Sequence, residues 1–224
     1  KILLEAPVSF IAFDLLEWEG KDLRNEPLSK RKAFLEELVQ QANHPKFKLS
    51  STLPFGSWEE LARVRENARE VQTEGLMLKK KDSLYETGRK RGAWWKWKLD
   101  PLHIDGVLIY AQKGHGKRAD LFTDYTFGVW DGEVLVSFAK AYSGLTNAEI
   151  REVDAYVKKN TKEKFGPVRT VNPGLVFEIA FEGIQASPRH KSGVALRFPR
   201  IARWRKDKTI DQANTLADLK ALLA

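Results

Sequence analysis

The sequence predicts an α+β fold in two parts, and three observations indicate it. Helix and strand patterns alternate through residues 1–99, whereas alternating apolar residues and turn signals dominate residues 100–224. The dipeptide Asp100-Pro101 separates the two patterns, because proline restricts the residue before it and ends a strand. We therefore expect two domains, one over residues 1–99 and one over residues 100–224.

The first part carries signals for short strands and two helices. An apolar run over Val8–Leu16 predicts a buried strand, and Pro27 with Ser29 opens a helix. Ser57 and Glu60 have the spacing of a capping box and start a second helix. Further short strands are expected at Pro45–Ser51, Gly75–Lys79 and Trp94–Leu99.

Strand patterns dominate the second part. Asp131-Gly132 lies between two apolar runs and predicts a tight hairpin turn, while Thr146 and Glu149 form another capping box before a helix. The expected strands are Gly106–Ala111, Tyr125–Trp130, Val134–Lys140, Leu175–Phe181 and Val194–Ile201, and Leu216, Leu219 and Leu223 mark a short closing helix. Three strands, a helix and two strands is the order of an OB-fold β-barrel.

Composition limits the classes of protein that fit. The chain has 224 residues and a formal net charge of +8, which favours a polyanionic partner because cations that neutralise phosphates release counterions. The absence of cysteine excludes disulfides, thiolate zinc sites and cysteine nucleophiles. No apolar run is long enough to span a bilayer, and the acidic residues within 1–18 do not suit a secretory signal.

Two lysines on one predicted strand are the strongest chemical signal. Lys96 and Lys98 are two positions apart, so both side chains point to the same side, and Trp95 and Trp97 point to the other. Two ammonium groups on one face repel each other unless an anion lies between them. The pair therefore predicts a phosphate site, and the alternative is a solvated strand face above a tryptophan core.

An acidic residue and an aromatic residue extend this signal. Glu74 precedes Gly75, whose missing side chain permits close backbone approach, and a carboxylate beside phosphates needs a bridging cation. Glu74 is thus a metal-ligand candidate, or else an exposed glutamate at a helix end. By strict alternation Lys79 faces away from Glu74, and only a twist or bulge would let both meet one ligand. Phe13 could stack on a purine, or else pack in a core.

Five segments together resemble the ATP-dependent DNA ligases of the covalent nucleotidyltransferase superfamily, especially the bacterial branch. They are Phe10–Leu16, Glu74–Lys79, Asp82–Tyr85 with Gly88-Arg89, Trp95–Lys98, and Arg197–Ile201 continuing through Arg203–Lys208. The resemblance implies a partial nucleotidyltransferase (adenylation) domain over residues 1–99, followed by an OB-fold domain over residues 100–224.

The resemblance also implies roles for residues. Phe13 would stack on the adenine of ATP, Glu74 would bind the catalytic metal, and Lys96 and Lys98 would contact the AMP phosphate and stabilise charge during transfer. On the OB domain, the residues that would engage the pyrophosphate of ATP are Arg205, Asp207 and Lys208. Basic residues expected to face the DNA nick are Arg89 and Arg91.

Two basic loops add candidate DNA contacts on charge alone. Lys117 and Arg118 lie in the run Lys113–Arg118, and a second run is Arg189-His190-Lys191. Such residues suit contacts to the phosphate backbone, although solvated turns have the same composition.

The implied activity is the sealing of 3′-OH/5′-phosphate nicks in double-stranded DNA, in repair, replication or recombination. ATP is the expected AMP donor, with Mg²⁺ or another divalent cation, and the reaction passes through enzyme–AMP and DNA-adenylate intermediates. The implied protein is a cytoplasmic, nucleoid-associated monomer with no membrane partner. Because the OB domain would serve both ATP and DNA, we expect a hinge near Leu99–Leu102.

One departure from the family is large. The 224 residues contain no Lys-x-Asp-Gly, the segment that carries the family's nucleophile. We therefore expect the later part of a ligase, unable by itself to form the enzyme–AMP intermediate. Two alternatives stay open: a non-catalytic OB-fold nucleic-acid-binding protein with a degenerate transferase remnant, and an RNA ligase or capping guanylyltransferase.

Overall fold

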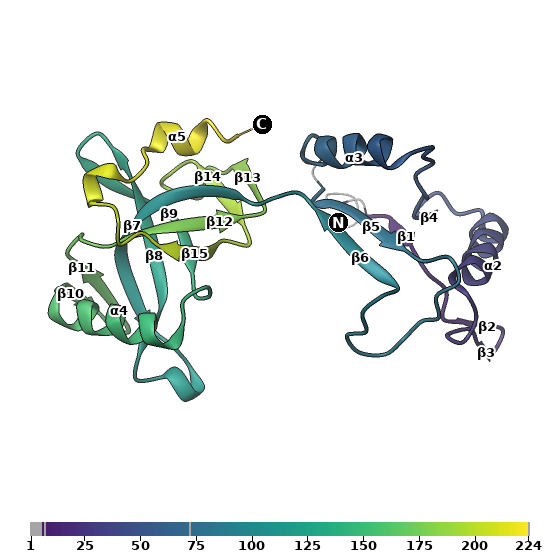
Figure 1. Cartoon of the computed structure of the whole chain (residues 1–224), viewed down its shortest axis with the longest axis horizontal. Helices are drawn as coiled ribbons and strands as arrows, with labels where there is room; N and C mark the ends of the chain where they lie inside the picture. The colour runs from purple at the N-terminus through teal and green to yellow at the C-terminus, as the bar shows by residue number, and fades with distance from the viewer. Residues whose placement is uncertain (1–5, 7, 72, 224) are drawn as a thin grey trace. The chain divides into compact units, whose positions relative to one another are not determined.

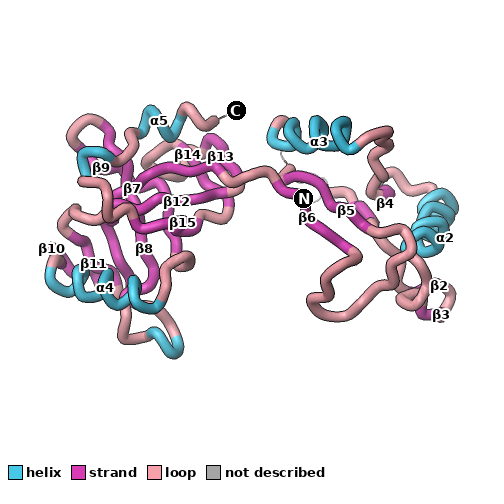
Figure 2. Tube along the Cα trace, viewed as in Figure 1, coloured by secondary structure: helices cyan, strands magenta, loops and turns pink. Residues whose placement is uncertain are grey.

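The computed structural model describes residues 6, 8–71 and 73–223, and the chain divides into two compact units, Lys1–Leu99 and Asp100–Ala224. Figure 1 labels the elements of both units, and Figure 2 distinguishes their helices, strands and loops. Each unit has its own paired strands. Within the described residues, no helix is both long and apolar enough to cross a membrane.

The first unit combines two α-helices with three strand pairs among its described residues. The helices are α2 (Leu28–Ala42) and α3 (Trp58–Glu66), and a 3₁₀ turn, η1 (Asn67–Arg69), follows α3. The pairs are β1 (Phe10–Ala12) with β4 (Phe47–Leu49), β2 (Glu17–Trp18) with β3 (Lys21–Asp22), and β5 (Gly75–Lys79) with β6 (Trp94–Lys98). Figure 2 shows the long loop that joins β5 to β6.

A buried ion pair fixes the end of β1 against α2. Arg31 is fully buried, and its guanidinium donates to the two carboxylate oxygens of Asp14 at 2.8 and 3.0 Å. It also donates to the backbone carbonyls of Glu26 and Ser83. A buried charge is tolerated only when it is paired and hydrogen-bonded, so this arrangement specifies where the residue before Asp14, Phe13, is held.

The buried strand predicted over Val8–Leu16 is wrong in length and in burial. Only Phe10–Ala12 pairs as β1, and Val8, Phe10 and Ile11 are 60%, 68% and 58% exposed. In the sheet topology β1 pairs with β4 alone, and apart from the stacking of Phe10 on Phe47 these side chains remain largely exposed. The apolar character of the run therefore does not report burial in this chain.

The second unit is built on a seven-stranded sheet in which β7 (Leu102–Lys113) is the central strand. The first half of β7 pairs with β12 (Val176–Phe181), and its second half pairs with β11 (Val168–Val171) and β8 (Phe122–Asp131). The remaining strands of the sheet are β9 (Val134–Ala141), β10 (Thr161–Phe165) and β15 (Arg200–Trp204), and a separate pair is β13 (Gly183–Ala186) with β14 (Val194–Arg197).

The predicted OB-type architecture is confirmed, but the described strands do not close into a barrel. Between β15 and the segment that follows β9, the Ile201 amide donates to the Ser143 carbonyl at 3.0 Å, without a paired ladder there. Partly open barrels are usual for OB folds. Figure 1 shows α4 (Asn147–Lys159) and α5 (Leu216–Lys220) at opposite ends of this sheet, and apolar residues of both helices belong to the main core.

Two features of the second unit differ from the sequence-based expectation, and two others agree with it. The single strand predicted over Val194–Ile201 is two strands, because Phe198 adopts a positive φ of 52° and Pro199 follows it. The hairpin of β10 and β11 was not predicted, since the polar run that forms it has no apolar alternation. The capping box at Thr146 and Glu149 and the turn at Asp131-Gly132 are confirmed.

Candidate functional site

The β5–β6 ribbon brings four predicted residues to one region of the first unit. Its antiparallel register pairs Gly75 with Lys98, Met77 with Lys96, and Lys79 with Trp94. Cross-strand partners share a face of the ribbon, so Lys79, Lys96 and Lys98 all lie on the same face. The side-by-side placement predicted for Lys96 and Lys98 agrees with this register.

Glu74 reaches this face because Gly75 distorts the start of β5. Gly75 has a φ of +134°, and a Cβ there would lie 2.3 Å from the carbonyl oxygen of Trp97 and 2.7 Å from the Cα of Lys98. Only glycine permits so close an approach of two backbones. The approach places the Glu74 carboxylate 2.9 Å from the Lys98 Nζ atom.

The distortion at Gly75 also explains how Lys79 and Glu74 can lie near one ligand. Strict alternation places Lys79 and Glu74 on opposite sides, and a bulge or twist was required for them to meet one ligand. Gly75 supplies that irregularity, since Glu74 contacts Lys98 while Lys79 shares the face of Lys98 through the strand register. Glu74, Lys79 and the lysine pair are therefore directed to one region.

Lys79 lies against two aromatic rings. Its Nζ atom is 4.7 Å from the ring centre of Phe13 and 4.1 Å from that of Trp94, within the range of cation–π contacts. Desolvation by burial lowers the pKa of Lys79, and the nearby charge of Asp14 partly opposes that shift. Lys79 thus links Phe13, at the end of β1, to the ribbon.

The opposite face of the ribbon is anchored by α3. The Arg65 guanidinium donates to the Lys98 carbonyl oxygen at 3.0 and 2.7 Å, and it lies 5.3 Å from the ring centre of Trp97. Trp58 packs edge-on against Trp97 at 6.1 Å, whereas Trp95 remains 49% exposed. Only Trp97 therefore fits the tryptophan core that the sequence suggested as an alternative.

Arg89 and Arg91 lie on the exposed loop between β5 and β6. A hollow of about 220 Å³ opens beside this loop, lined by Leu84, Tyr85, Glu86, Gly88, Lys90, Ala93 and Trp94. The sequence reasoning selected the two arginines and missed Lys90, which lines the hollow.

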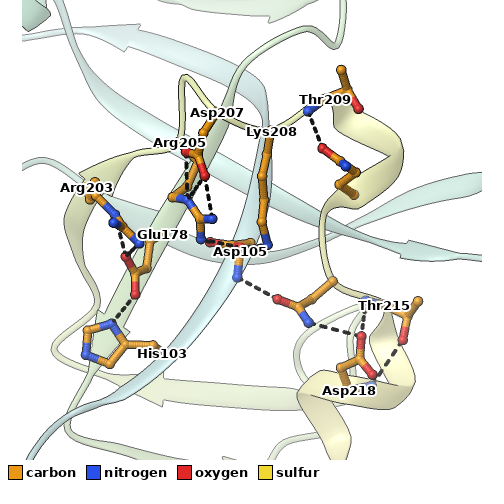
Figure 3. Close-up of polar contacts among 12 residues, drawn as sticks. His103, Asp105, Glu178, Arg203, Arg205, Asp207, Lys208, Thr209, Thr215 and Asp218 are labelled. Carbon is orange, nitrogen blue, oxygen red and sulfur yellow. Dashed lines mark hydrogen bonds and ion pairs between the residues drawn. The ribbon is translucent and has the colours of Figure 1, made fainter.

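The second cluster of predicted residues forms an ion-pair network in the second unit (Figure 3). The Arg205 guanidinium donates from Nε and Nη2 to Asp207 at 3.0 and 2.8 Å, and from Nη1 to Asp105 at 2.9 Å. The Lys208 Nζ atom donates to the same Asp105 oxygen at 2.6 Å. The structure therefore brings Arg205, Asp207 and Lys208 together around Asp105.

The electrostatics favour the charged forms of Arg205 and Asp207. The hydrogen bonds between the Arg205 guanidinium and the Asp207 carboxylate lower the pKa of Asp207 to about 2 and raise the pKa of Arg205. Asp105 was not selected from the sequence, although it is the one carboxylate of β7, stands beside an apolar run and is only 5% exposed. A buried charge of this kind requires a partner, and that rule was the signal available.

No contact between the two basic loops, Lys113–Arg118 and Arg189–Lys191, is seen among the described residues. Lys117 and Arg118 lie on a 3₁₀ turn, η2 (Gly116–Arg118), and the Arg118 Nη2 atom donates to the Asn147 side chain at 2.9 Å. Lys117 and the run Arg189-His190-Lys191 are exposed. Their contact with DNA stays a prediction.

The described residues include no group of three or more histidine or acidic side chains that could hold a metal ion. Glu74 belongs to no such group, and it remains a candidate as one carboxylate ligand. Mg²⁺ suits such a site, because it commonly binds one or two carboxylates together with phosphate oxygens and water.

Comparisons with known proteins identify the family of the chain. Residues 1–98 match the sequence model of the ATP dependent DNA ligase domain, and residues 118–208 match that of the ATP dependent DNA ligase C terminal region. Both parts of the chain thus match the ATP-dependent class of DNA ligases. The chain belongs to the family of ATP-dependent DNA ligases.

Individual relatives support this family. The chain is 39% identical to a probable DNA ligase of Koribacter versatilis over 95% of its length and 40% of the relative, and 33% identical to a DNA ligase of Thermococcus onnurineus over 99% and 40%. It therefore spans about 40% of the length of these curated relatives.

Two solved structures share the fold. One comes from a structure–function study of Lig E DNA ligases as a minimal DNA-binding scaffold, with a TM-score of 0.62 and 21% identity, covering 88% of this chain and 63% of that one. The other, Pmar-Lig_PreS3, has a TM-score of 0.61 and 18% identity, with coverage of 81% and 40%. At these identities the likeness concerns the fold alone.

Proposed function

We propose that this chain supplies nucleotide-binding and OB-fold parts of an ATP-dependent DNA ligase that seals nicks in duplex DNA. The observation that carries the proposal is the charged face of the β5–β6 ribbon, where Glu74 lies 2.9 Å from Lys98 and where Lys96 and Lys79 share its side. Membership of the ligase family supports the same reading.

In this proposal, the ribbon holds the adenylate. Phe13 stacks on the adenine, because the ring lies next to the charged face through its contact with Lys79. Lys96 and Lys98 bind the phosphate of AMP, since two ammonium groups on one face stabilise an anion between them and the charge that develops during transfer. In this arrangement Phe13 contacts the base of AMP, and the two lysines contact its phosphate.

Glu74 holds the divalent cation, Mg²⁺ or another, together with phosphate oxygens of the nucleotide. In the structure the Lys98 ammonium pairs with the Glu74 carboxylate. A divalent cation bound to Glu74 would displace Lys98 from this ion pair, and Lys98 would then pair with a phosphate of the nucleotide. A bound divalent cation supplies positive charge that neutralises phosphoryl oxygens. Glu74 is the residue of this chain that orients it.

The second unit contributes the diphosphate and DNA contacts. Arg205 and Lys208 engage the pyrophosphate of ATP, because a guanidinium and an ammonium converge there within one network, and Asp207 takes part through its ion pair with Arg205. Arg89 and Arg91 on the first unit, and Lys117 and Arg118 on the second, bind the DNA backbone. The expected partners are ATP and nicked double-stranded DNA, bound by a monomer.

A nick that already carries AMP tests the proposal directly. In the last step, the 3′-hydroxyl attacks the 5′-phosphate and AMP leaves, so that step needs no lysine nucleophile. The 224-residue chain is therefore incubated with Mg²⁺ and a labelled nicked duplex bearing a 5′-adenylate, and in parallel with labelled ATP alone. We expect sealing of the adenylated nick and no protein-bound label from ATP.

Variants make the test specific. Glu74→Ala and Lys98→Ala should abolish sealing, whereas Lys30→Ala, which removes an exposed ion pair with Glu26, should leave it intact. If the chain binds the nick but never seals it, the non-catalytic nucleic-acid-binding protein becomes the better description. If it neither binds nor seals, the proposed function is wrong.

A further inference from the structure

Asp105 is a buried carboxylate whose backbone is held on both sides. It lies on β7 between the buried residues Ile104 and Gly106, and its own exposed fraction is 5%. Its amide donates to the Asn214 Oδ1 atom at 2.9 Å, and its carbonyl accepts from the Asn214 amide at 3.1 Å. The carboxylate therefore projects from a rigid part of the sheet.

Two cations share one oxygen of this carboxylate (Figure 3). Arg205 Nη1 lies 2.9 Å and Lys208 Nζ lies 2.6 Å from Asp105 Oδ2. Without a common anion these two cationic groups would repel each other, and each long side chain loses rotamer entropy when it is held in one place. Asp105 thus brings the two charges together and orders both side chains before any ligand arrives.

We propose that Asp105 is a positioning residue that holds Arg205 and Lys208 as a convergent pair for a diphosphate. This inference rests on the proposed function, which assigns those two cations to pyrophosphate. The Arg205 guanidinium donates to Asp105 only through Nη1, and its Nε–Nη2 edge donates to Asp207. Because the Asp207 side chain is 63% exposed, that edge is open to exchange with a phosphate while Asp105 stays in place.

Whether Asp105→Asn raises or lowers the affinity for the anion distinguishes a positioning role from a purely electrostatic one. Removing a negative charge beside an anion site raises anion affinity if charge alone matters. If Asp105 positions the pair, Asp105→Asn lowers affinity despite that gain. Glu178 offers a matched control, since it is the cross-strand partner of Asp105 and pairs instead with His103 and Arg203.

The experiment is a calorimetric titration of the 224-residue chain with inorganic pyrophosphate at fixed ionic strength. We expect Asp105→Asn to bind about fivefold more weakly than the natural chain, which corresponds to disordering one of the two cationic side chains. Asp105→Glu keeps the charge but displaces it, so its affinity should fall between the two. Glu178→Gln should bind as well as the natural chain or more tightly. Equal or tighter binding by Asp105→Asn overturns the proposal.

Melting curves of each variant distinguish positioning from a general loss of structure. Asp105→Asn and Glu178→Gln should both lower the melting temperature, and only the former should lower affinity. If Asp105→Asn does not fold, Asp105→Glu decides, because unchanged affinity there refutes positioning. Arg205→Ala and Lys208→Ala test the underlying assignment: if both bind pyrophosphate normally, the diphosphate role of the pair is wrong, independently of Asp105.

Discussion

Gly75 controls both the stability of the β5–β6 ribbon and the geometry of the charged face. Replacing it with alanine places a Cβ 2.3 Å from the Trp97 carbonyl oxygen, about 1 Å inside an ordinary van der Waals contact. The second close neighbour, the Lys98 Cα atom, also belongs to the backbone. Neither atom can rotate away, so the strands must separate where Glu74 meets Lys98.

The magnitude follows from two contributions. An alanine held at a φ of +134° is strained by about 1–3 kcal/mol, and overpacking against backbone adds about 1–3 kcal/mol. Gly92 provides a matched control on the loop that leads into β6, since its φ is +108° and a Cβ there meets nothing within 4 Å. Gly92→Ala should therefore show the strain without the clash, and the two variants should differ by about 1–3 kcal/mol.

Tryptophan fluorescence during urea unfolding measures this difference, because five of the seven tryptophans lie within residues 1–99. Sealing of an adenylated nick measures the functional consequence. Since a misplacement of about 1 Å can lower a rate on the order of 100-fold, Gly75→Ala should seal far more slowly than Gly92→Ala. If the two variants unfold at the same urea concentration and seal at the same rate, the close backbone approach has no role in the site.

Further predictions concern burial, acid and DNA. Arg31→Met leaves Asp14 buried without its partner and should destabilise the chain by about 3–5 kcal/mol in urea unfolding, whereas Lys30→Met should change it by less than about 1 kcal/mol. The pKa of Asp207 falls from 3.8 in the unfolded chain to about 2 in the folded chain. Its contribution to stability is therefore present above pH 4 and is lost as the pH falls toward 2. In Asp207→Asn, the melting temperature should depend less on pH between pH 4 and pH 2 than it does in the natural chain. Arg89→Ala should weaken DNA binding equally for all sequences and reduce the salt slope by about 1, and an unchanged slope contradicts a phosphate contact.

Features that depend on local chemistry were predictable from the sequence. The capping box of Thr146 and Glu149 and the turn at Asp131-Gly132 are confirmed because each is specified by neighbouring residues alone. The shared face of Lys96 and Lys98 follows from the period of a strand, which tertiary packing does not alter. In each case the physical cause lies within a few residues along the chain.

Features that depend on distant partners were not predictable. The break between β14 and β15 is an exception, because Pro199 was a local signal that the prediction of a single strand did not use. Asp105 is separated by 100 residues from Arg205, so its role emerges only when β7 and the segment after β15 are in contact. Burial of Val8–Leu16 failed as a prediction because an apolar run indicates a tendency to be covered, and the covering element is a tertiary property.

Both charged clusters share one physical feature, and it bears on how they would bind phosphates. Lys98 pairs with Glu74, and Arg205 and Lys208 pair with Asp105, so these cations already have carboxylate partners before a ligand binds. A phosphate that binds must therefore share or replace an ion pair, and the free energy of binding is the difference between the two arrangements. In the arrangement that we propose, Asp105 on β7 stays in place and orients the cations, whereas a phosphate replaces the exposed Asp207. Affinity for diphosphates should consequently respond in opposite directions to neutralising Asp105 and neutralising Asp207, and pyrophosphate titrations of Asp105→Asn and Asp207→Asn that shift the same way would contradict this division.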